Sequence, residues 1–175
     1  MGRIVMSEDR KPAIILLGHG SRVQQASGDM EKVATALREQ HGYSRVACCY
    51  MSRLGPHLPE TLQGLITAGA TSVLVIPYFL HMGVHLRLDI PELLQEEARK
   101  YSGVRIQLGA HLGYDDVLVG LVHRRIVGSL DAADVRDLAL PPRSAFPIPP
   151  GQDEFVPMPP EEAKRYAAER GHHHH

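Results

Sequence analysis

Aromatic residues, cysteines, net charge and long apolar runs are all scarce in this sequence. It has no Trp, nine Tyr and Phe residues together, and 19 basic residues against 20 acidic ones. Binding of nucleic acid draws on a basic surface or on aromatic rings that stack with bases, so this composition makes a nucleic-acid-binding protein a poor hypothesis. The longest apolar run, near residues 73–80, contains a proline and is far shorter than the roughly 18 residues that span a membrane.

Cellular location and redox state can be predicted from two further absences. The amino-terminal residues MGRIVMSEDRK lack the apolar segment of a signal peptide, so a cytoplasmic protein is expected. The two cysteines, Cys48 and Cys49, are adjacent in sequence, which is a poor geometry for an ordinary disulfide. We therefore expect two reduced thiols within a strand.

Length and composition indicate one ordinary globular domain with an extension. Of the 175 residues, 43% are hydrophobic and 22% are charged. The final run from His172 to His175, after Gly171, is typical of a purification-tag remnant. We predict an α/β domain over residues 12–130, a Pro-rich carboxy-terminal extension over 131–170 and the tag remnant over 171–175.

Short apolar runs alternate with helical periodicity along residues 12–130. Apolar residues at helical spacing follow each run, and Gly42 and Gly69 stand where the first two helices would stop. Pro91 is placed for the first turn of the third helix. The last stripe comprises Val117, Leu118, Leu121, Val122 and Ile126. The four predicted strands are Ala13–Leu17, Arg45–Met51, Thr71–Leu80 and Val104–Leu108.

This alternation predicts a doubly wound, four-stranded parallel sheet of the flavodoxin-like kind, with helices on both faces. The first and third strands are almost entirely apolar, as central strands are. In a sheet of order 2-1-3-4, the crevice lies beyond the carboxyl ends of strands one and three, where the winding reverses. We expect the functional site there.

The sequence changes character after residue 130. Eight of the 13 prolines lie between Pro141 and Pro160, so this stretch is neither a strand nor the interior of a helix. Its apolar residues include Phe146, Phe155 and Met158. They favour an extended arm that wraps a surface, and the alternative is a solvated linker. Residues 161–170 could close the arm as a short helix.

Two segments place chemically capable side chains at the predicted crevice. The turn after strand one reads Gly18-His19-Gly20-Ser21-Arg22, in which the glycines leave the imidazole unobstructed. A tight turn with an exposed histidine is the simpler alternative. The loop after strand three contains His81 and His85, and at least one of them should converge with His19. Two imidazoles suit Fe, Co, Ni or Zn and leave coordination positions open.

Three other site types fit the sequence less well. A phosphohistidine phosphatase would need Arg directly before its His, where Gly18 stands. The chain lacks the G-x-S-x-G elbow of a serine hydrolase. A dinucleotide-binding turn would need a third glycine after G-H-G. We interpret the remaining histidines, His41, His57, His111 and His123, as surface or loop residues. For His111, which follows strand four, a position near the crevice is the alternative.

The same segments resemble a known family. The GHGSR turn, the LGPHLPETL stretch, and VIPYFLHMGVHLRLDIPELL followed by LGYDD are similar to the small CbiX-type chelatases, which insert a metal ion into sirohydrochlorin. The resemblance covers about residues 12–128 and implies a class II chelatase fold and a homodimer of small subunits. It also implies that His19 and His85 are the catalytic and metal-binding residues, with His81 as a further possibility.

The sequence departs from the resemblance at one position. Many relatives carry a carboxylate near the end of strand two, where this chain reads Met51-Ser52-Arg53. The departure leaves open which group accepts the protons of the macrocycle and which metal is used. Residues after Leu130 lie outside the resemblance.

The residues also suit this chemistry independently of the resemblance. Sirohydrochlorin carries many carboxylates, and insertion of a divalent ion displaces two pyrrole protons. Fifteen of the 19 basic residues are Arg, whose planar fork matches a carboxylate. Arg22, Arg53 and Arg87 each follow the carboxyl end of a strand and are candidate substrate-binding residues, and the alternative for each is a solvated surface charge. Ser21 and neighbouring amides could bind an anion, whereas Asp89 more readily caps the third helix.

We therefore predict a metal chelatase that acts on sirohydrochlorin in cobalamin or siroheme biosynthesis. Cobalt is the first expected metal, ferrous iron the second and nickel the third, and the ion is a substrate rather than a cofactor. No organic cofactor, nucleic acid or membrane partner is expected. The alternative is a non-catalytic carrier of tetrapyrrole or metal, in which the same histidines hold a cargo.

Overall fold

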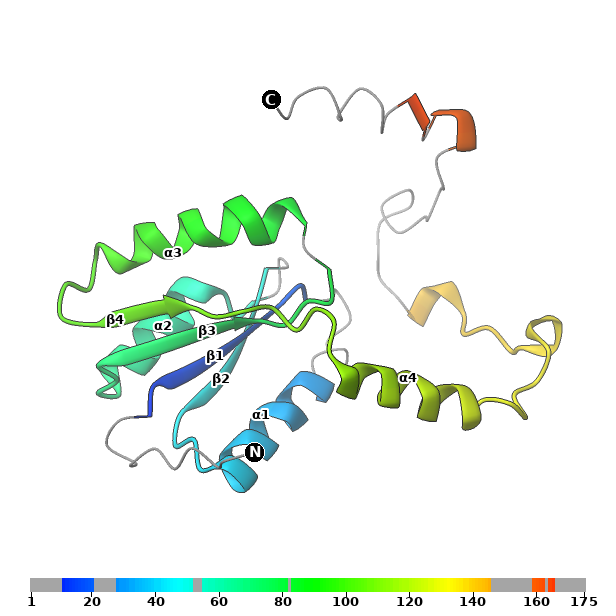
Figure 1. Ribbon diagram of the computed structural model, residues 1–175, viewed down its shortest axis with the longest axis horizontal. Helices are drawn as coiled ribbons and strands as arrows, with labels where there is room; N and C mark the ends of the chain where they lie inside the picture. The colour runs from blue at the N-terminus through cyan, green and yellow to red at the C-terminus, as the bar shows by residue number, and fades with distance from the viewer. Residues whose placement is uncertain are drawn as a thin grey trace. The chain divides into compact units, whose positions relative to one another are not determined.

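The computed structural model describes residues 11–20, 28–51, 55–81, 83–145, 159–162, 164 and 165, and it describes the backbone but not the side chain of His85 and Arg143. The chain divides into two compact units, residues Met1–Leu138 and Ala139–His175, which we treat separately. Figure 1 shows the first unit as a twisted sheet with helices packed against it.

Four parallel strands form the sheet. They are β1 (Ala13–Gly18), β2 (Val46–Tyr50), β3 (Ser72–Pro77) and β4 (Arg105–Leu108), in the spatial order β2-β1-β3-β4. This order confirms the predicted doubly wound topology. Every residue of β1 is buried because β1 lies between β2 and β3, whereas the edge strand β4 has no fully buried residue.

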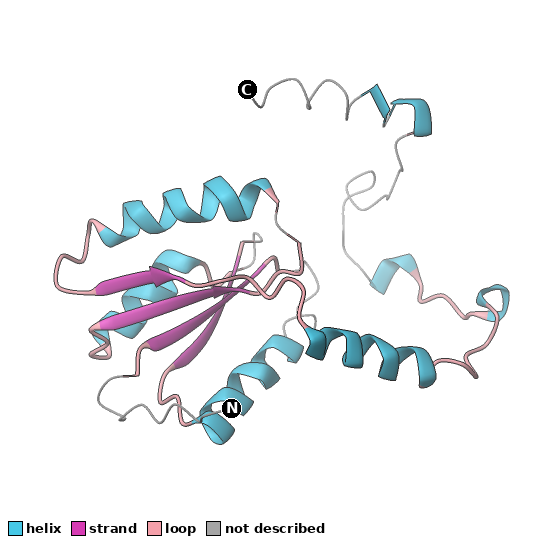
Figure 2. Cartoon of the chain, in the orientation of Figure 1, coloured by secondary structure: helices cyan, strands magenta, loops and turns pink. Residues whose placement is uncertain are grey.

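Three of the long helices cover the sheet. They are α1 (Gly28–His41), α2 (Leu58–Thr67) and α3 (Ile90–Ala98), and Figure 2 shows α1 on one side of the sheet with α2 and α3 on the other. On the α2–α3 side, Leu62 and Ile90 are completely buried against alternate residues of β1 and β3. On the α1 side, Met30 and Ala34 pack with the other alternate residues of β1 and β2. These two clusters form the hydrophobic core of the first unit.

The fourth helix, α4 (Asp116–Val127), forms where its apolar stripe predicts it but does not cover the sheet; other helices cover the two faces, as predicted. None of its residues, all of which the structure describes, is buried. On the α1 side of the sheet, Leu74 and Ile76 of β3 are therefore only partly buried. The apolar stripe of α4 was predicted correctly from the sequence, but such a stripe does not indicate which surface the helix packs against.

The two cysteines occupy opposite faces of β2. Cys48 belongs to the cluster under α1, and Cys49 belongs to the cluster under α2 and α3. Both are free and buried, which confirms the prediction of two reduced thiols in a strand. Burial raises the pKa of Cys48 and of Cys49 to about 12, with the nearby Glu31 adding to the increase at Cys48.

The chain after α4 forms only short helical turns where it is described. These are the 3-10 turns η4 (Val135–Asp137) and η5 (Arg143–Ala145), and residues 160–162, 164 and 165 are helical. The predicted anchors Phe146, Phe155 and Met158 lie outside the described residues, so the wrapping arm stays a prediction. Among the described residues, no helix is long and apolar enough to cross a membrane.

Candidate functional site at the carboxyl edge of the sheet

His19 stands directly beyond the carboxyl end of β1, in the turn that the sequence singled out. Gly18 is buried, and a Cβ added to it would lie 3.0 Å from Met30 Sδ, so α1 packs closely against the start of the turn. Gly20 has a φ of 83°, a backbone conformation that side-chain-bearing residues rarely adopt. The His19 side chain is exposed, with Nδ1 3.4 Å from the carbonyl oxygen of Gly20. Its imidazole is thus open to an incoming ligand.

The end of β2 is fastened beside this turn. The Met51 amide donates a hydrogen bond to the carbonyl of Gly18 (3.0 Å), and the Tyr50 amide donates one to the carbonyl of Pro56 (2.9 Å). Met51 therefore lies beside the start of the His19 turn, and Pro56 lies beside the end of β2. The predicted substrate-binding residue Arg53 and the neighbouring Ser52 lie in this segment but outside the described residues.

The loop after β3 meets the same edge. The Tyr78 amide donates a hydrogen bond to the carbonyl of Leu17 (2.7 Å), which continues the pairing of β3 with β1 beyond the strands. His81 follows in this loop and is exposed. His85 opens the π-helical turn η3 (His85–Asp89), which also carries the exposed Arg87. These predicted site residues therefore follow the carboxyl end of β3, the strand that pairs with β1.

The prediction that Asp89 caps the third helix was wrong. Asp89 has φ −66° and ψ −44°, which is helical backbone, and its side chain makes no capping hydrogen bond. The reason is that η3 runs directly into α3, so the chain is already helical before Ile90. Pro91 does stand in the first turn of α3, as predicted.

His57, which we interpreted as a surface or loop residue, also follows the carboxyl end of a strand, and so does His111, for which the position near the crevice was the alternative. His57 precedes α2, where its Nδ1 is 3.2 Å from Glu60 Oε1 and its amide donates to the Glu60 carboxylate. Glu60 stands three residues after His57, which is the spacing of a capping box, so this pair could have been predicted from the sequence. His111 lies between β4 and α4, where a Cβ on Gly113 would come within 2.9 Å of its Nε2.

The segment that carries His111 is tied to the loop after β3. The Gly113 amide donates a hydrogen bond to the carbonyl of Phe79, with a donor–acceptor distance of 3.2 Å. Asp115 then begins α4 by accepting a hydrogen bond from the Val117 amide at 2.8 Å. Segments following all four strands therefore meet at one edge, as the winding of the sheet requires.

Metal binding at this edge would rest on few protein ligands. Within the described part of the chain, no group of three or more His, Cys, Asp and Glu side chains is arranged to hold a metal ion. Two imidazoles from different loops would leave most coordination positions open, which suits an ion in transit rather than a structural ion. Ser21 and Arg22, the other predicted substrate-binding residues, lie outside the described residues.

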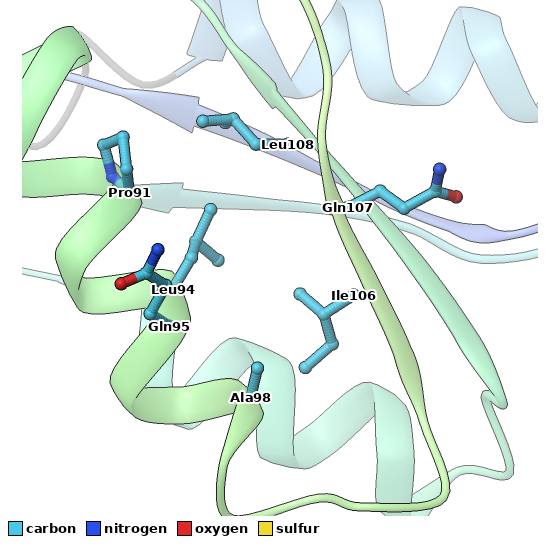
Figure 3. A pocket seen from close by; sticks show the side chains of 7 residues that line it. All are labelled: Pro91, Leu94, Gln95, Ala98, Ile106, Gln107 and Leu108. Carbon is cyan, nitrogen blue, oxygen red and sulfur yellow. The ribbon is translucent and has the colours of Figure 1, made fainter.

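A hollow on the α3–β4 surface is chemically unlike this edge. Figure 3 shows it between one side of α3 and the edge strand β4. Its volume is about 220 Å³, and no titratable side chain lines it. The lining residues are Pro91, Leu94, Gln95, Ala98, Ile106, Gln107 and Leu108.

Comparison with known proteins gives consistent matches for the sheet domain. The family model described as CbiX matches residues 13–129, which include all four strands and α4. The chain is 32% identical over 113 residues to the chloroplastic sirohydrochlorin ferrochelatase of Arabidopsis thaliana. It is 29% identical over 128 residues to the sirohydrochlorin cobaltochelatase of Methanococcoides burtonii.

The coverage of these relatives differs. The match to the Arabidopsis protein takes in 65% of this chain and 50% of that protein, whereas the match to the Methanococcoides protein takes in 69% and 96%. The chain thus spans about half the length of the first and nearly all of the second. Among solved structures, the sirohydrochlorin chelatase SirB from Bacillus subtilis subspecies spizizenii in complex with cobalt superposes with a TM-score of 0.62. It is 27% identical, and the match covers 67% of this chain and 50% of SirB.

Proposed function

The chain belongs to the CbiX family, and we propose that it inserts a divalent metal ion into sirohydrochlorin. The observation that carries the proposal is that the matched residues 13–129 contain both histidine segments, which directly follow the adjacent strands β1 and β3. The relatives named as cobaltochelatase and ferrochelatase support the same reaction. We assign the activity to the α/β domain, residues 12–130, and treat 131–170 as an extension outside it.

We propose that His19 and His85 hold the incoming metal ion and accept the pyrrole protons. The exposed imidazole of His19, on a turn flanked by glycines, is free to approach a flat ring from one side. A neutral imidazole has one free lone pair, so it can bind the divalent ion first and accept a pyrrole proton after the ion has moved into the ring. His81 is the alternative partner because it lies four residues earlier in the same loop.

Arginines are proposed to bind the carboxylates of the macrocycle. The position of Arg87 supports this role, because Arg87 is exposed in η3 at the edge where His81 and His85 lie. A guanidinium can donate two parallel hydrogen bonds to one carboxylate. Arg22, Arg53 and Ser21 are proposed for the same task from their positions in the sequence after strands one and two.

Cobalt is the proposed first metal, followed by ferrous iron and then nickel. Imidazole binds all three, so the residues alone do not rank them. The cobalt complex of SirB and the names of the cobaltochelatase and ferrochelatase relatives favour the first two. We propose that the reaction needs no organic cofactor, since the ion itself is inserted.

A homodimer is the proposed working form. A sheet of four strands is a small frame for a wide, flat ring, so a second subunit would supply the other wall of the cavity.

The cytoplasm is the proposed compartment, since reduced thiols such as those of Cys48 and Cys49 are usual there.

Insertion assays test the proposal directly. Anaerobic sirohydrochlorin is mixed with Co²⁺, Fe²⁺ or Ni²⁺ in separate reactions, and the absorbance change of the macrocycle is followed with and without the protein. We expect many equivalents of product for each equivalent of protein, fastest with Co²⁺. A carrier of tetrapyrrole or metal would stop at one equivalent, and no acceleration with any of the three ions would exclude the chelatase reaction.

A further inference from the structure

His57 and Glu60 form a histidine–carboxylate pair at the start of α2, the helix that follows β2. His57 Nδ1 lies 3.2 Å from Glu60 Oε1, and the His57 amide donates a hydrogen bond to Glu60 Oε2 at 3.3 Å. Among the histidine side chains that the structure describes, that of His57 alone lies within ion-pair distance of a carboxylate. The two side chains are 42% and 64% exposed, so solvent and ligands can reach the pair.

The imidazole of His57 is held by Gly55 and by Glu60. A Cβ added to Gly55 would lie 3.2 Å from both Nδ1 and Cε1 of His57, so the bare backbone of Gly55 packs against the ring. The Glu60 amide also faces the His57 side chain, as in a capping box. The ionised carboxylate is the stronger partner of the ring. Because a carboxylate can only accept, Nδ1 carries the ring hydrogen, and the lone pair of the neutral ring is on Nε2.

A short series of backbone contacts joins this pair to the His19 turn. Gly18 at the end of β1 pairs with Tyr50 of β2, and the Tyr50 amide donates a hydrogen bond of 2.9 Å to the carbonyl of Pro56. His19 and His57 are the residues that follow Gly18 and Pro56. The two histidines therefore start from neighbouring points at the carboxyl edge of the sheet.

The backbone of His57 is also anchored to the core. Leu58, the next residue, is 2% exposed and belongs to the same core cluster as Cys49 of β2. The Thr61 amide and hydroxyl both donate to the His57 carbonyl, at 3.2 Å and 2.8 Å. His57 cannot leave the edge without exposing Leu58, so its imidazole is held in place before any ligand arrives.

Metal insertion needs a base that does not hold the ion. A pyrrole nitrogen bonds to the ion only after it has lost its proton, so the first proton leaves while His19 and His85 can still hold the ion. An imidazole that holds the ion has its lone pair occupied. Residues 51–59 contain no Asp or Glu, so Glu60 is the first carboxylate after β2. The base nearest to that carboxylate is His57.

Other titratable groups near the pair are poor bases for this proton. Burial raises the pKa of the Cys49 thiol to about 12, with the charges of Cys48 and Glu60 adding to the increase, so this thiol keeps its own proton. Asp115, which follows β4, accepts a hydrogen bond from the Val117 amide and caps α4. These groups leave the exposed imidazole of His57 as the suitable acceptor.

We propose that His57 accepts the first pyrrole proton and that Glu60 is its positioning residue. The inference rests on the proposed chelatase reaction and adds a third imidazole to it. One pyrrole N–H bond breaks, the electron pair left on that nitrogen forms the bond to the divalent ion, and the proton moves to Nε2 of His57. The carboxylate of Glu60 stabilises the imidazolium, which then releases the proton to water on its exposed side. The second proton goes to His19 or His85 after the ion has left them.

Helix capping is the simpler role of the same pair, and it predicts different variant behaviour. Ser is among the preferred N-cap residues, and Gln can replace Glu at the third position of a capping box. His57→Ser and Glu60→Gln therefore keep the cap, whereas the first removes the base and the second removes the charge. A capping role predicts normal activity in both variants.

The first test removes the base. In His57→Ser, kcat for insertion of Co²⁺ into anaerobic sirohydrochlorin should fall about 100-fold or more, with little change in KM or in melting temperature. Added imidazole should restore part of the lost rate and should not accelerate the wild type. His123→Ser is the matched control, because His123 is exposed on α4 and should show neither the loss nor the rescue.

The second test removes the charge. Glu60→Gln should lower kcat roughly 10-fold or more while KM and the melting temperature stay unchanged, because the imidazolium loses its carboxylate. Glu92→Gln is the control, since Glu92 is an exposed carboxylate in the first turn of α3. An unchanged kcat in Glu60→Gln would show that Glu60 only caps α2, and it would overturn its positioning role.

The outcomes separate this inference from the proposed function. A wild type that accelerates no insertion would reject the chelatase reaction and the role of His57 with it. An active wild type with an equally active His57→Ser would reject only the role of His57. A loss of rate in His57→Ser that imidazole does not restore would also overturn that role. Circular dichroism shows whether each variant folds, and His57→Asn, another good N-cap, replaces His57→Ser if that variant does not.

Discussion

The Tyr78 amide donates a hydrogen bond of 2.7 Å to the carbonyl of Leu17, which joins the chain leaving β3 to the end of β1. His19 follows Leu17 by two residues, and His81 follows Tyr78 by three. The two histidine-bearing segments therefore start from one hydrogen-bonded point at the carboxyl edge of the sheet.

Replacement of His19 by Ala should remove most of the metal-insertion rate. A positioned base typically contributes about 10²- to 10⁴-fold in rate, and His19 is the exposed imidazole nearest to the end of β1. The melting temperature should change little, because an exposed side chain buries little surface. Initial insertion rates and thermal melts of His19→Ala test this. His41→Ala is the matched control, since His41 is also exposed but ends α1 at the opposite edge; equal rates for both variants would reject the assignment.

His85→Ala should reduce the insertion rate more than His81→Ala. The family resemblance places the functional histidine at His85, and the backbone of His85 begins η3 whereas His81 lies in the preceding loop. Binding of sirohydrochlorin, measured by absorbance titration, should persist in both variants because arginines and amides hold the carboxylates. A larger loss of insertion rate for His81→Ala would mean that His81, rather than His85, binds the metal ion.

Replacement of Arg87 by Ala should weaken substrate binding more than it slows the chemical step. A charged hydrogen bond to a carboxylate contributes about 1.5 to 3 kcal/mol, so KM for sirohydrochlorin should rise roughly 10- to 100-fold with a smaller change in kcat. Arg99→Ala is the control, because Arg99 is exposed just beyond α3, about 18 Å along the helical axis from Arg87. An unchanged KM in Arg87→Ala would mean that Arg87 is a solvated surface charge and does not bind the substrate.

The two buried thiols should make the protein less stable in alkaline solution. The pKa of Cys48 and of Cys49 is about 12 in the folded chain and 9.0 ordinarily, so the unfolded chain loses thiol protons first as pH rises. Their contribution to stability is complete below about pH 9 and declines between pH 9 and 12. Urea unfolding at pH 8 and pH 10 should show a larger loss for the wild type than for the Cys48→Ala, Cys49→Ala variant, and equal losses would contradict the burial effect.

The sequence by itself determined the sheet and the edge where chemistry is expected. The apolar run of β1 can be satisfied only between two strands, and the alternation of strands with amphipathic helices leads to parallel pairing through crossover connections. Gly18 and Gly20 mark a turn whose backbone needs glycine, so the position of His19 could also be read from local residues.

Only the tertiary structure decided where amphipathic surfaces go and how loops are fastened. The stripe of α4 is as clear in sequence as that of α1, yet Met30 of α1 is buried on the sheet and Val122 of α4 is exposed. The Gly113–Phe79 hydrogen bond and the Asp115 cap, which have no periodic signal, account for the difference because they set the direction of the helix. His57 and His111 reach the edge of the sheet for the same reason, since contacts between residues distant in sequence depend on topology rather than on local pattern.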